Sequence, residues 1–310
     1  LVIANGDTPI IGDQEVLVDV KAIGVNRADI LQRFGNYPPP KGESEILGLE
    51  MSGVIAKVGQ HVEHWKVGQR VFGLVPGGAY AEQVKLLAAH LFALPPDWTF
   101  EQGASVAEVY LTAYQSLFTI ARLSPGQSVM IHAGASGVGT AAIQLAKAID
   151  CEVVVTVSSD SKAKSCLALG ADYALNYNEV DFVKWVKENK PAGFDVIIDV
   201  VAAGYVNRNI QVSAMDGHIV ILSILGGRYA EKVDVAKMLL KRVTITASTL
   251  RNRTNDYKTE LVNALQRDFG FQDGQLKPVI DSVLPWEEAT KAHQLLIDNC
   301  NVGKVILTIN

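Results

Sequence analysis

One stretch of the chain decides its fold: residues 127–160 read QSVMIHAGASGVGTAAIQLAKAIDCEVVVTVSSD. The apolar run VMI at 129–131 lies between Pro125-Gly126 and a glycine-rich turn, which predicts a short buried strand. Apolar residues at helical spacing then run from Val138 to Ile149. The β-branched run VVVTV at 153–157 predicts a second strand, buried on both faces of a parallel sheet. The stretch therefore predicts a strand, a helix and a second strand, with glycines at the first turn.

The turn between the first strand and the helix predicts a phosphate-binding site. Its glycines are Gly134, Gly137 and Gly139, and Ser136 stands where the usual G-x-G-x-x-G has its middle glycine. A helix N-terminus offers unpaired N–H groups and the positive end of a dipole, and glycines let a pyrophosphate approach the backbone. A tight turn without a ligand is the alternative, but the complete crossover around these glycines favours the phosphate site.

Length and composition exclude several classes of protein. A chain of 310 residues with 48% hydrophobic and 20% charged residues can build two domains with separate cores. A formal charge of −5 gives no electrostatic footprint for nucleic acid, and no apolar run approaches the length of a membrane span. The three cysteines lack CxxC spacing, which is typical of a reduced, cytoplasmic protein without a cysteine-built zinc site. Because the chain starts Leu1-Val2 without a signal-peptide layout, we expect a trimmed N-terminus.

Strand and helix patterns divide the chain into a β-rich part and an alternating part. Short strands between glycine turns are predicted at residues 10–25, 48–59, 67–73 and 79–84, as in a compact barrel-like domain. A helix is predicted over residues 99–123, and further buried strands at 195–200 and 217–222. The alternation from 129 to 249 predicts a doubly wound α/β sheet. Helices at 256–268 and 286–299 and a strand at 302–309 complete the chain.

Several motifs in this order resemble one family. They are VNRAD at 25–29, LGLEMSG at 47–53, HAGASGVGTAAIQLA at 132–146 and LGAD at 169–172. Together they resemble the medium-chain dehydrogenase/reductase superfamily, in its zinc-free, zeta-crystallin-like quinone oxidoreductase branch. NYPPP at 36–40 and STLRNR at 248–253 further resemble the stress-inducible NADPH:quinone reductases. Members begin with an extra strand that Leu1 lies beyond, so part of the first hairpin is expected to be missing.

The resemblance implies the domain organisation. It implies a GroES-like catalytic domain formed by residues 1–109 and 252–310, and a central Rossmann domain that binds NADP at 110–251. It also implies a homodimer, and the apolar strand at 243–247 would leave an exposed sheet edge if no partner covered it.

The residues at two positions indicate whether the chain can bind a catalytic zinc ion. Zinc alcohol dehydrogenases of the superfamily have a cysteine near the position of Asn26 and a histidine where Leu49 stands, and neither residue here is a usual zinc ligand. Without a Lewis acid, oxidation of an alcohol lacks a means of stabilising the alkoxide. Reduction of an electrophilic quinone or enone needs mainly hydride proximity and a proton donor. We therefore expect an enzyme without a metal and without flavin.

The residues after the second strand of the crossover predict the choice of nicotinamide cofactor. An NAD enzyme usually places an acid there, whereas this strand ends in Ser158-Ser159 and is followed by Lys162, a suitable partner for a 2′-phosphate. Asp160 lies beyond the strand end and is expected to cap the next helix. NADPH is therefore the predicted cofactor. The resemblance adds Tyr177, which packs against the adenosine, and Asn301; Val138 belongs to the phosphate turn with its glycines and Ser136.

The resemblance also implies the catalytic residues. It assigns Asn26, Tyr37 and Thr112 to the nicotinamide end of the site, and the Tyr37 phenol could hydrogen-bond a quinone oxygen as charge develops there. A structural role in the Pro-rich loop is the alternative for Tyr37. Asp29 and Glu50 are expected to orient loops, and His132 to lie in the core. The role of Arg251 and Arg253, at the cleft or at a dimer contact, is left open.

The expected function is hydride transfer from NADPH to a quinone. A double-bond reductase for enones or enoyl thioesters is the nearest alternative, since it uses the same cofactor and a polarised carbonyl. A non-catalytic NADPH-binding redox sensor or structural protein is an alternative of another class.

Overall fold

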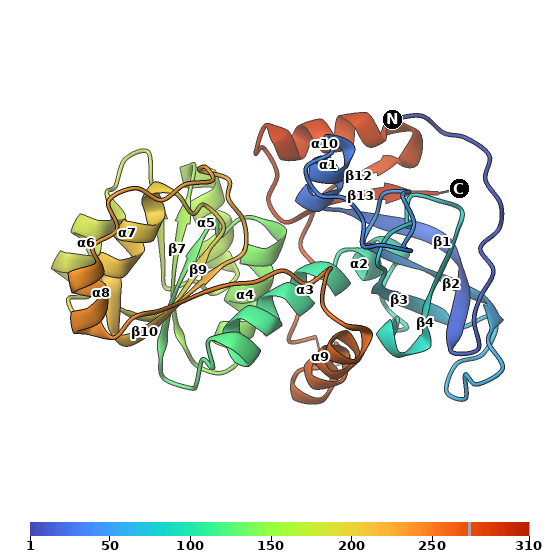
Figure 1. The fold of residues 1–310 in the computed structure, drawn as a ribbon, viewed down its shortest axis with the longest axis horizontal. Coiled ribbons are helices and arrows are strands. Elements are labelled where there is room, and N and C mark those ends of the chain that lie inside the picture. The colour runs from blue at the N-terminus through green and yellow to red at the C-terminus, as the bar shows by residue number, and fades with distance from the viewer. Residues whose placement is uncertain (272–273, 310) are drawn as a thin grey trace. The chain divides into compact units, whose positions relative to one another are not determined.

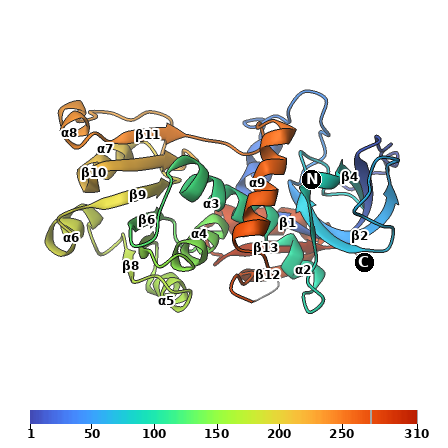
Figure 2. The same cartoon turned by 90° about the horizontal axis from the view of Figure 1, so that it is seen from below.

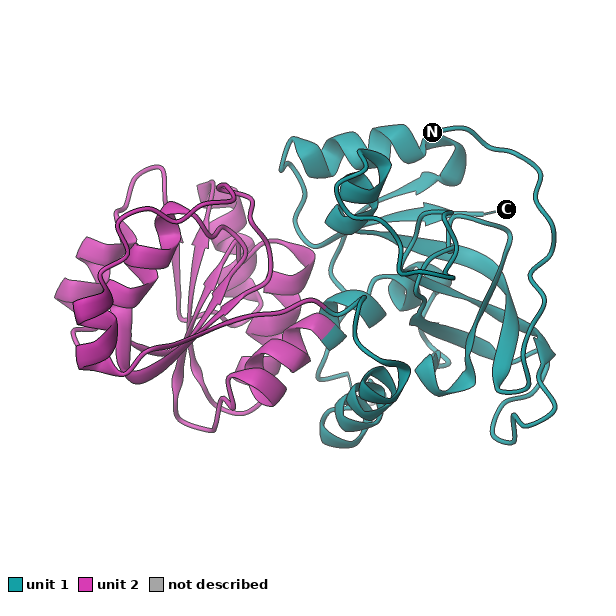
Figure 3. Ribbon diagram, in the orientation of Figure 1, with its two compact units in different colours: residues 1–111, 250–310 teal, residues 112–249 magenta. Residues whose placement is uncertain are grey.

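The computed structural model describes residues 1–271 and 274–309, and the chain divides into two compact units (Figure 3). Unit 1 is formed by residues 1–111 and 250–310, and unit 2 by residues 112–249. Both ends of the chain therefore belong to unit 1, and unit 2 is inserted between its two segments.

Unit 2 is built on a six-stranded parallel sheet. Its strands are β6 (Ser128–His132), β7 (Glu152–Val157), β8 (Tyr173–Asn176), β9 (Phe194–Asp199), β10 (Ser213–Ile221) and β11 (Thr244–Ala247). They lie in the order β11-β10-β9-β6-β7-β8, with β11 and β8 at the edges (Figure 2). The order along the chain reverses at β6, as in dinucleotide-binding sheets. The predicted doubly wound α/β fold is confirmed.

Helices cover both faces of this sheet (Figure 1). They are α4 (Gly137–Lys147), α5 (Asp160–Ala168), α6 (Phe182–Asn189), α7 (Gly204–Val212) and α8 (Val235–Lys241). Met130, Ile197 and Ile219 of the sheet form one buried cluster with Phe182 of α6 and Ile210 of α7. On the other face of the sheet, Val129, Ile131 and Val155 are buried as well, which is why the strands read as nearly continuous hydrophobic runs.

Unit 1 contains a seven-stranded sheet. Its strands are β1 (Glu15–Val25), β2 (Glu50–Val58), β3 (Arg70–Leu74), β4 (Gln83–Leu87), β5 (Leu91–Ala93), β12 (Ile280–Pro285) and β13 (Lys304–Thr308). The long strand β1 pairs antiparallel with β2, β4 and β13. The pairing joins the N-terminal and C-terminal segments into one domain.

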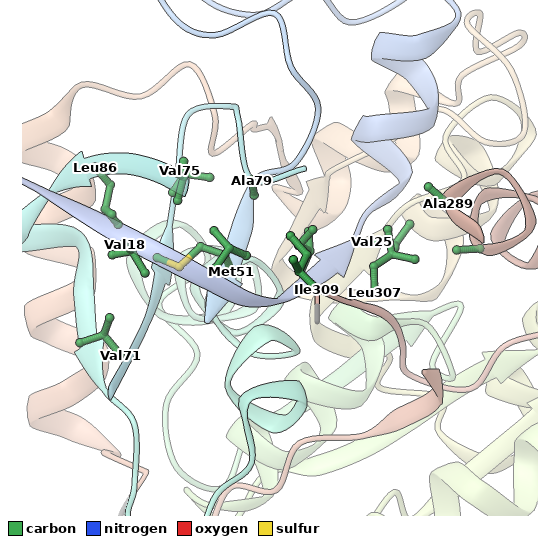
Figure 4. Packing of buried hydrophobic residues seen from close by; sticks show 14 of the residues in the cluster. Val18, Val25, Met51, Val71, Val75, Ala79, Leu86, Ala289, Leu307 and Ile309 are labelled. Carbon is green, nitrogen blue, oxygen red and sulfur yellow. The ribbon is translucent and has the colours of Figure 1, made fainter. Parts of the chain in front are cut away.

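The core of unit 1 lies around β1 (Figure 4). Val18 of β1, Met51 of β2 and Leu307 of β13 are buried together there, with Ala289 and Ala292 of α10 (Ala289–Ile297) packed on the cluster. The other helices of this unit are α1 (Arg27–Arg33), α2 (Phe100–Ala104) and α9 (Asn255–Asp268), with short 3₁₀ turns at Ala88–His90 and Trp286–Glu288. Helix α3 (Ala107–Tyr114) begins in unit 1 and ends in unit 2.

The prediction of a single helix over residues 99–123 is wrong. The structure has α2, then α3, and then a π-helical turn at Gln115–Ile120. The chain leaves α2 at Ser105, whose hydroxyl bonds the Gln102 carbonyl at 2.7 Å. The N–H of Glu108 then donates to the Glu50 carboxylate at 2.9 Å, so a side chain from β2 fixes the start of the second helix. Such a tertiary contact leaves no local sequence signal.

Other element predictions differ in position. The strand expected at 79–84 lies at Gln83–Leu87, because the N–H groups of Ala79 and Tyr80 bond loop carbonyls of Gly48 and Leu47. The expected helix 286–299 is a 3₁₀ turn followed by α10. Strands β5, β8 and β12 were not predicted. Among the described residues, no helix combines the length and the apolar character needed to cross a membrane.

Candidate active site

The glycine-rich turn connects β6 to α4 in unit 2. Ser136 is the N-cap of α4, and its Oγ accepts the N–H of Gly139 at 3.1 Å. A Cβ on Gly139 would lie 2.5 Å from the carbonyl oxygens of Ala133 and Gly134, and one on Gly134 would lie 2.5 Å from Val155 Cβ. Both glycines are therefore required by the close approach of helix, turn and strand.

The same turn fits a pyrophosphate. The N–H groups of Gly137 and Val138 belong to the first turn of α4, where no carbonyl of the helix can accept them. The eleven-residue helix directs the positive end of its dipole to this point. Backbone donors and a favourable dipole thus meet at the carboxyl end of β6, where anionic groups of dinucleotides bind in such sheets.

The helix after β7 begins differently from the prediction. Ser159, with an extended backbone, is the N-cap of α5, and its Oγ accepts the N–H of Lys162 at 3.4 Å. The expectation that Asp160 caps this helix is therefore wrong. Asp160 is the first helical residue, and its carboxylate accepts from Asn176 Nδ2 at 3.0 Å. A serine in the extended conformation takes the capping position, and the acid gains the favourable first-turn dipole.

Tyr177 is held beside the end of β7. Its N–H donates to Val157 O at 3.0 Å, and the neighbouring Asn178 Nδ2 donates to Ser158 O at 2.8 Å. The Tyr177 side chain is 45% exposed, and Lys162 is partly exposed in the first turn of α5. The predicted adenosine-site residues Ser159, Lys162 and Tyr177 therefore gather on one accessible edge of unit 2.

His132 lies at the end of β6 and is 1% exposed, which confirms that it is a core residue. Its Nδ1 bonds Thr156 Oγ1 at 2.9 Å, and its Nε2 bonds Asn209 Oδ1 at 2.8 Å. Asn209 in turn donates to Asp199 at 2.9 Å. Burial lowers the pKa of His132, so the ring is neutral and both of its nitrogens are used inside unit 2.

Asn26 of unit 1 is locked in a buried polar network. Its Nδ2 donates to Gly24 O at 3.1 Å and to Glu50 Oε1 at 2.9 Å. Its Oδ1 accepts from Lys304 Nζ at 2.7 Å, and the same ammonium lies 2.7 Å from Glu50 Oε1. Three hydrogen bonds fix the amide, so Asn26 is a rigid part of the wall formed by β1, β2 and β13.

Asp29 and Glu50 hold loops in place, as expected from the sequence. The Asp29 carboxylate accepts the N–H of Asn26 at 2.8 Å, the N–H of Gly48 at 3.2 Å and the Tyr80 hydroxyl at 3.3 Å. Burial raises the pKa of Asp29 to about 6, against the effect of the Asn26 and Gly48 N–H groups and of Lys304. The carboxyl therefore acts as a loop anchor with no exposed surface.

Tyr37 faces the guanidinium of Arg251, whose central carbon lies 5.6 Å from the ring centroid. Arg251 is 4% exposed and donates to Pro76 O at 2.8 Å and to Gln32 Oε1 at 2.7 Å. Within unit 1, Arg251 thus ties the Tyr37 loop to two other segments. Burial, assisted by Glu108, raises the pKa of the Tyr37 phenol, which keeps it protonated as a hydrogen-bond donor.

Glu108 was missed by the sequence analysis. It lies in the first turn of α3, and its N–H donates to Glu50 Oε2 at 2.9 Å. Burial, with a smaller contribution from the Glu50 carboxylate, raises the pKa of its carboxyl to about 8, against the opposing effect of Lys304. Glu108 precedes Thr112 by one helical turn. This spacing places it on the same helix face as a predicted site residue, which is a signal that the sequence could have supplied.

The remaining predicted residues are divided between the units. Thr112 and the phosphate-turn residues belong to unit 2, whereas Asn26, Tyr37 and Asn301 belong to unit 1. The Thr112 carbonyl accepts the Ser116 hydroxyl at 2.7 Å, and Asn301 Nδ2 donates to Gly303 O at 2.7 Å. Across residues 1–271 and 274–309, no group of three or more His, Cys, Asp or Glu side chains could hold a metal ion.

Two family models match the chain. Residues 12–96 match the alcohol dehydrogenase GroES-like domain, and residues 137–267 match a model described as zinc-binding dehydrogenase. The human quinone oxidoreductase is 31% identical over 304 residues, covering 97% of this chain and 91% of that protein. The chain belongs to the quinone oxidoreductase family of medium-chain dehydrogenases/reductases. Family membership makes it an oxidoreductase with a nicotinamide cofactor, as the sequence motifs predicted.

Two further comparisons extend this result. The synaptic vesicle membrane protein VAT-1 homolog of Danio rerio is 30% identical over 315 residues, and the alignment covers 97% of this chain and 65% of that protein. The chain thus spans less than two thirds of the length of this relative. The crystal structure of Escherichia coli quinone oxidoreductase complexed with NADPH has a TM-score of 0.85 at 30% identity, covering 99% of this chain and 95% of that one.

The fold alone does not select the nicotinamide cofactor. A solved NAD-dependent alcohol dehydrogenase has a TM-score of 0.88 at 30% identity, covering 99% of this chain and 95% of that one. The choice between NADH and NADPH must therefore come from side chains at the ends of β7 and β8.

Proposed function

We propose that this chain is an NADPH-dependent quinone oxidoreductase that works without a metal. The observation that carries the proposal is the network around Asn26, in which an amide and the Lys304 ammonium bind Glu50. Zinc alcohol dehydrogenases have a metal-binding cysteine near the position of Asn26. A metal would have to displace a buried ammonium here, so a substrate that is already electrophilic suits this chain better than an alcohol.

The reaction needs a hydride, a hydrogen-bond donor for the substrate oxygen and a proton. When bound, NADPH supplies the hydride. Tyr37 supplies the donor, because its phenol stays protonated and is fixed by Arg251. Asn26, the second residue assigned to the substrate, has little freedom to move, since its amide makes three hydrogen bonds. A pre-oriented donor favours a substrate oxygen that gains negative charge during the reaction.

NADPH rather than NADH is proposed from the residues after β7. The pyrophosphate is assigned to the turn with Gly134, Ser136, Gly137, Val138 and Gly139. The 2′-phosphate is assigned to Ser159 and Lys162, and the adenosine to Tyr177. The strand end offers two serines and a lysine, and Asp160 is engaged by Asn176. An acid that would bind a free 2′-hydroxyl is therefore turned to another partner.

A homodimer is proposed from the exposed apolar residues of unit 2. Strand β11 is an edge of the sheet, and Val235, Leu239 and Leu240 of the neighbouring α8 are 67%, 77% and 74% exposed. A second copy would cover this edge and these side chains. Light scattering at micromolar concentration should give twice the chain mass. A monomer would contradict the assignment.

The free thiols Cys151, Cys166 and Cys300 support a reducing, cytoplasmic location.

A substrate panel tests the function. The purified chain is assayed with NADPH and a 1,4-naphthoquinone, an enone and an enoyl thioester, and with NADP⁺ and a primary alcohol, each with and without a strong chelator. Quinone reduction that is fastest and insensitive to chelator is expected. A higher kcat/KM for the enoyl thioester would favour the double-bond reductase. Tight NADPH binding without turnover of any acceptor would favour the non-catalytic sensor.

A further inference from the structure

A chain of four buried polar side chains crosses the carboxyl end of the sheet in unit 2. They are at most 1% exposed and belong to Thr156 of β7, His132 of β6, Asn209 of α7 and Asp199 of β9. Thr156 Oγ1 lies 2.9 Å from His132 Nδ1. His132 Nε2 lies 2.8 Å from Asn209 Oδ1, and Asn209 Nδ2 donates to Asp199 Oδ2 at 2.9 Å. One continuous series of contacts thus joins three neighbouring strands and a helix.

The partners of Asp199 fix the direction of every hydrogen bond in this chain. Its Oδ1 accepts two N–H groups of the loop that follows β9, and its Oδ2 accepts the amide of Asn209. Because Asn209 donates through Nδ2, its Oδ1 must accept from His132, which places the imidazole proton on Nε2. The neutral ring then accepts the Thr156 hydroxyl proton at Nδ1.

Asp199 holds the loop that follows β9 in a conformation that its residues rarely adopt. Asp199 Oδ1 accepts the N–H of Val201 at 2.7 Å and the N–H of Ala202 at 2.9 Å. Ala202 has a φ of 58°, and Ala203 has a φ of 46° with a ψ of −120°. A Cβ disfavours both conformations. Strain of this kind persists only where surrounding contacts enforce it, and it is typical of sites that bind ligands.

This loop, residues 200–203, lies where a dinucleotide is expected to bind. Strands β6 and β9 are neighbours, and the strand order reverses between them, since β7 and β8 follow on one side and β10 and β11 on the other. Ligands of such sheets bind outside the carboxyl ends of the strands at this reversal. The phosphate turn follows β6 and the loop 200–203 follows β9, so the two segments flank this binding position.

The polar chain ties the turn and the loop to one another. His132 is the last residue of β6 and directly precedes the turn, whose Ala133 also has a positive φ, of 53°. Thr156 supports the turn a second time, because its carbonyl accepts the N–H of Gly134 at 3.0 Å. Asp199 is the last residue of β9 and directly precedes the loop. The chain therefore couples the position of the turn to that of the loop.

We propose that Asp199 is a positioning residue of the cofactor site: through Asn209 and His132 it holds the loop 200–203 in a fixed place relative to the phosphate turn. This inference rests on the proposed binding of the dinucleotide at that turn. Asp199 has no exposed surface, so it acts on cofactor affinity only through the loop. The cofactor then meets a segment that is already ordered and does not lose affinity in ordering it.

Asp199→Ala tests this role, because it removes every bond from the carboxylate to the loop and to Asn209. If the released loop occupies the held conformation about a tenth of the time, NADPH affinity falls about tenfold. Asp195→Ala is the matched control, since Asp195 begins the same strand at the opposite end of the sheet. Its Oδ2 accepts the N–H and the hydroxyl of Ser128 on β6, each at 2.8 Å. Isothermal titration is performed at a temperature where circular dichroism shows each variant to be folded.

Asp199→Asn tests the continuity of the chain. The oxygen of the new amide can keep the two loop N–H groups, but its NH₂ group faces Asn209, which must then reverse its own amide. Asn209 then presents Nδ2 to His132, so the imidazole proton moves from Nε2 to Nδ1 and is donated to Thr156. NMR of isotope-labelled imidazole nitrogens reports this tautomer, and His132→Gln identifies its signal. A role in stability alone would not move the cofactor affinity.

We expect Asp199→Ala to bind NADPH about tenfold more weakly and Asp195→Ala to bind it like the parent chain. Asp199→Asn should keep the parent affinity and show the opposite tautomer of His132. A folded Asp199→Ala variant with the parent affinity overturns the positioning role, as does an equal loss in Asp195→Ala. An unchanged tautomer in Asp199→Asn contradicts the continuous chain. A parent chain that binds neither NADPH nor NADH overturns the proposed function instead.

If Asp199→Ala does not fold, Asn209→Ala decides the matter. It separates Asp199 from His132 and leaves the carboxylate bonded to the loop. A folded Asn209→Ala variant with weaker NADPH binding, beside an unaffected Asp195→Ala, supports the positioning role. A folded Asn209→Ala variant with the parent affinity contradicts it, because the loop would then keep its place without the connection to β6.

Discussion

Lys304 Nζ lies 2.7 Å from Glu50 Oε1, and the two side chains are 4% and 0% exposed. The pair joins β13, near the end of the chain, to β2 in its first segment. Asn26 bonds both partners, so its amide, the Lys304 ammonium and the Glu50 carboxylate form one closed hydrogen-bonded network. A buried ion pair of this kind stabilises the fold only while both partners are present, because either charge alone would be unsolvated.

Replacing Lys304 by methionine should therefore destabilise the chain strongly. The Glu50 carboxylate would keep its burial and lose its counter-charge, which costs about 3–5 kcal/mol. Urea denaturation of the full chain, followed by circular dichroism, measures the change in the free energy of unfolding.

The surface pair Lys291–Glu288 provides the matched control. Its nitrogen and oxygen lie 2.9 Å apart, but the side chains are 66% and 44% exposed. Lys291→Met should change the free energy of unfolding by less than about 1 kcal/mol. Equal effects of the two substitutions would mean that Glu50 is hydrated or neutral after all.

The raised pKa of Glu108 also predicts how stability varies with pH. The folded chain keeps this proton up to about pH 8, whereas the unfolded chain loses it near 4.5. Between these values the unfolded state binds fewer protons, so the free energy of unfolding of the parent falls as pH rises. Glutamine does not titrate. The stability of Glu108→Gln relative to the parent should therefore increase across this range and level off above it.

Urea denaturation of both proteins at a series of pH values measures this difference. The Asp29 carboxyl titrates in both proteins and cancels to first order. A stability difference independent of pH would show that Glu108 has an ordinary pKa in the folded chain, whatever its effect on activity.

The close contacts of Gly139 predict that the phosphate turn does not tolerate a side chain at this position. The Cβ of Gly139→Ala would meet two backbone carbonyl oxygens at 2.5 Å, so α4 would have to move away from the turn. A loss of about 1–3 kcal/mol of stability and weaker NADPH binding are expected. Gly204→Ala, also at the start of a helix, meets no atom within 4 Å and should be neutral. Unchanged cofactor affinity in a folded Gly139→Ala variant would remove the turn from the cofactor site.

Much of the fold could be predicted because its signals are local. The glycine-rich turn and the run at 153–157 carry their structure in adjacent residues, and the six-stranded sheet follows from the alternation of such segments. The break between α2 and α3 could not be predicted, because it depends on the Glu50 carboxylate of β2 receiving the Glu108 N–H. Short strands such as β8 lack a long apolar run and gain their stability from a neighbouring strand.

Only part of the candidate site could be predicted from the sequence. Asn26, Tyr37 and Ser136 stand in recognisable motifs, and their roles in binding and catalysis stay predictions. Lys304 and Glu108 stand in no motif, since their importance comes from burial beside Glu50 rather than from spacing along the chain. Asp160 was misassigned as a cap because serine and aspartate both favour that position, and the backbone conformation of Ser159 decides between them.

The choice of cofactor gives the sharpest prediction at the edge of unit 2. Lys162 lies in the first turn of α5, close to Ser159 and on the edge where Tyr177 is 45% exposed. A charge-assisted hydrogen bond from its ammonium to a 2′-phosphate contributes roughly 1.5–3 kcal/mol and has no counterpart with NADH. Lys162→Ala should therefore weaken NADPH binding about tenfold to a hundredfold and leave NADH nearly unchanged. Isothermal titration with each cofactor measures the two affinities.

Lys164→Ala is the matched control, because this exposed lysine lies on the same helix two residues further along. It should leave both affinities at the parent value. Ser159 and Tyr177 remain in Lys162→Ala, so the preference for NADPH should shrink without inverting. If Lys162→Ala weakened both cofactors equally, the lysine would act on the shape of the site and not on the phosphate. If Lys164→Ala had the same selective effect, the long-range charge of α5 rather than a contact from Lys162 would determine the preference, because two lysines on different faces of a helix cannot both bond one phosphate.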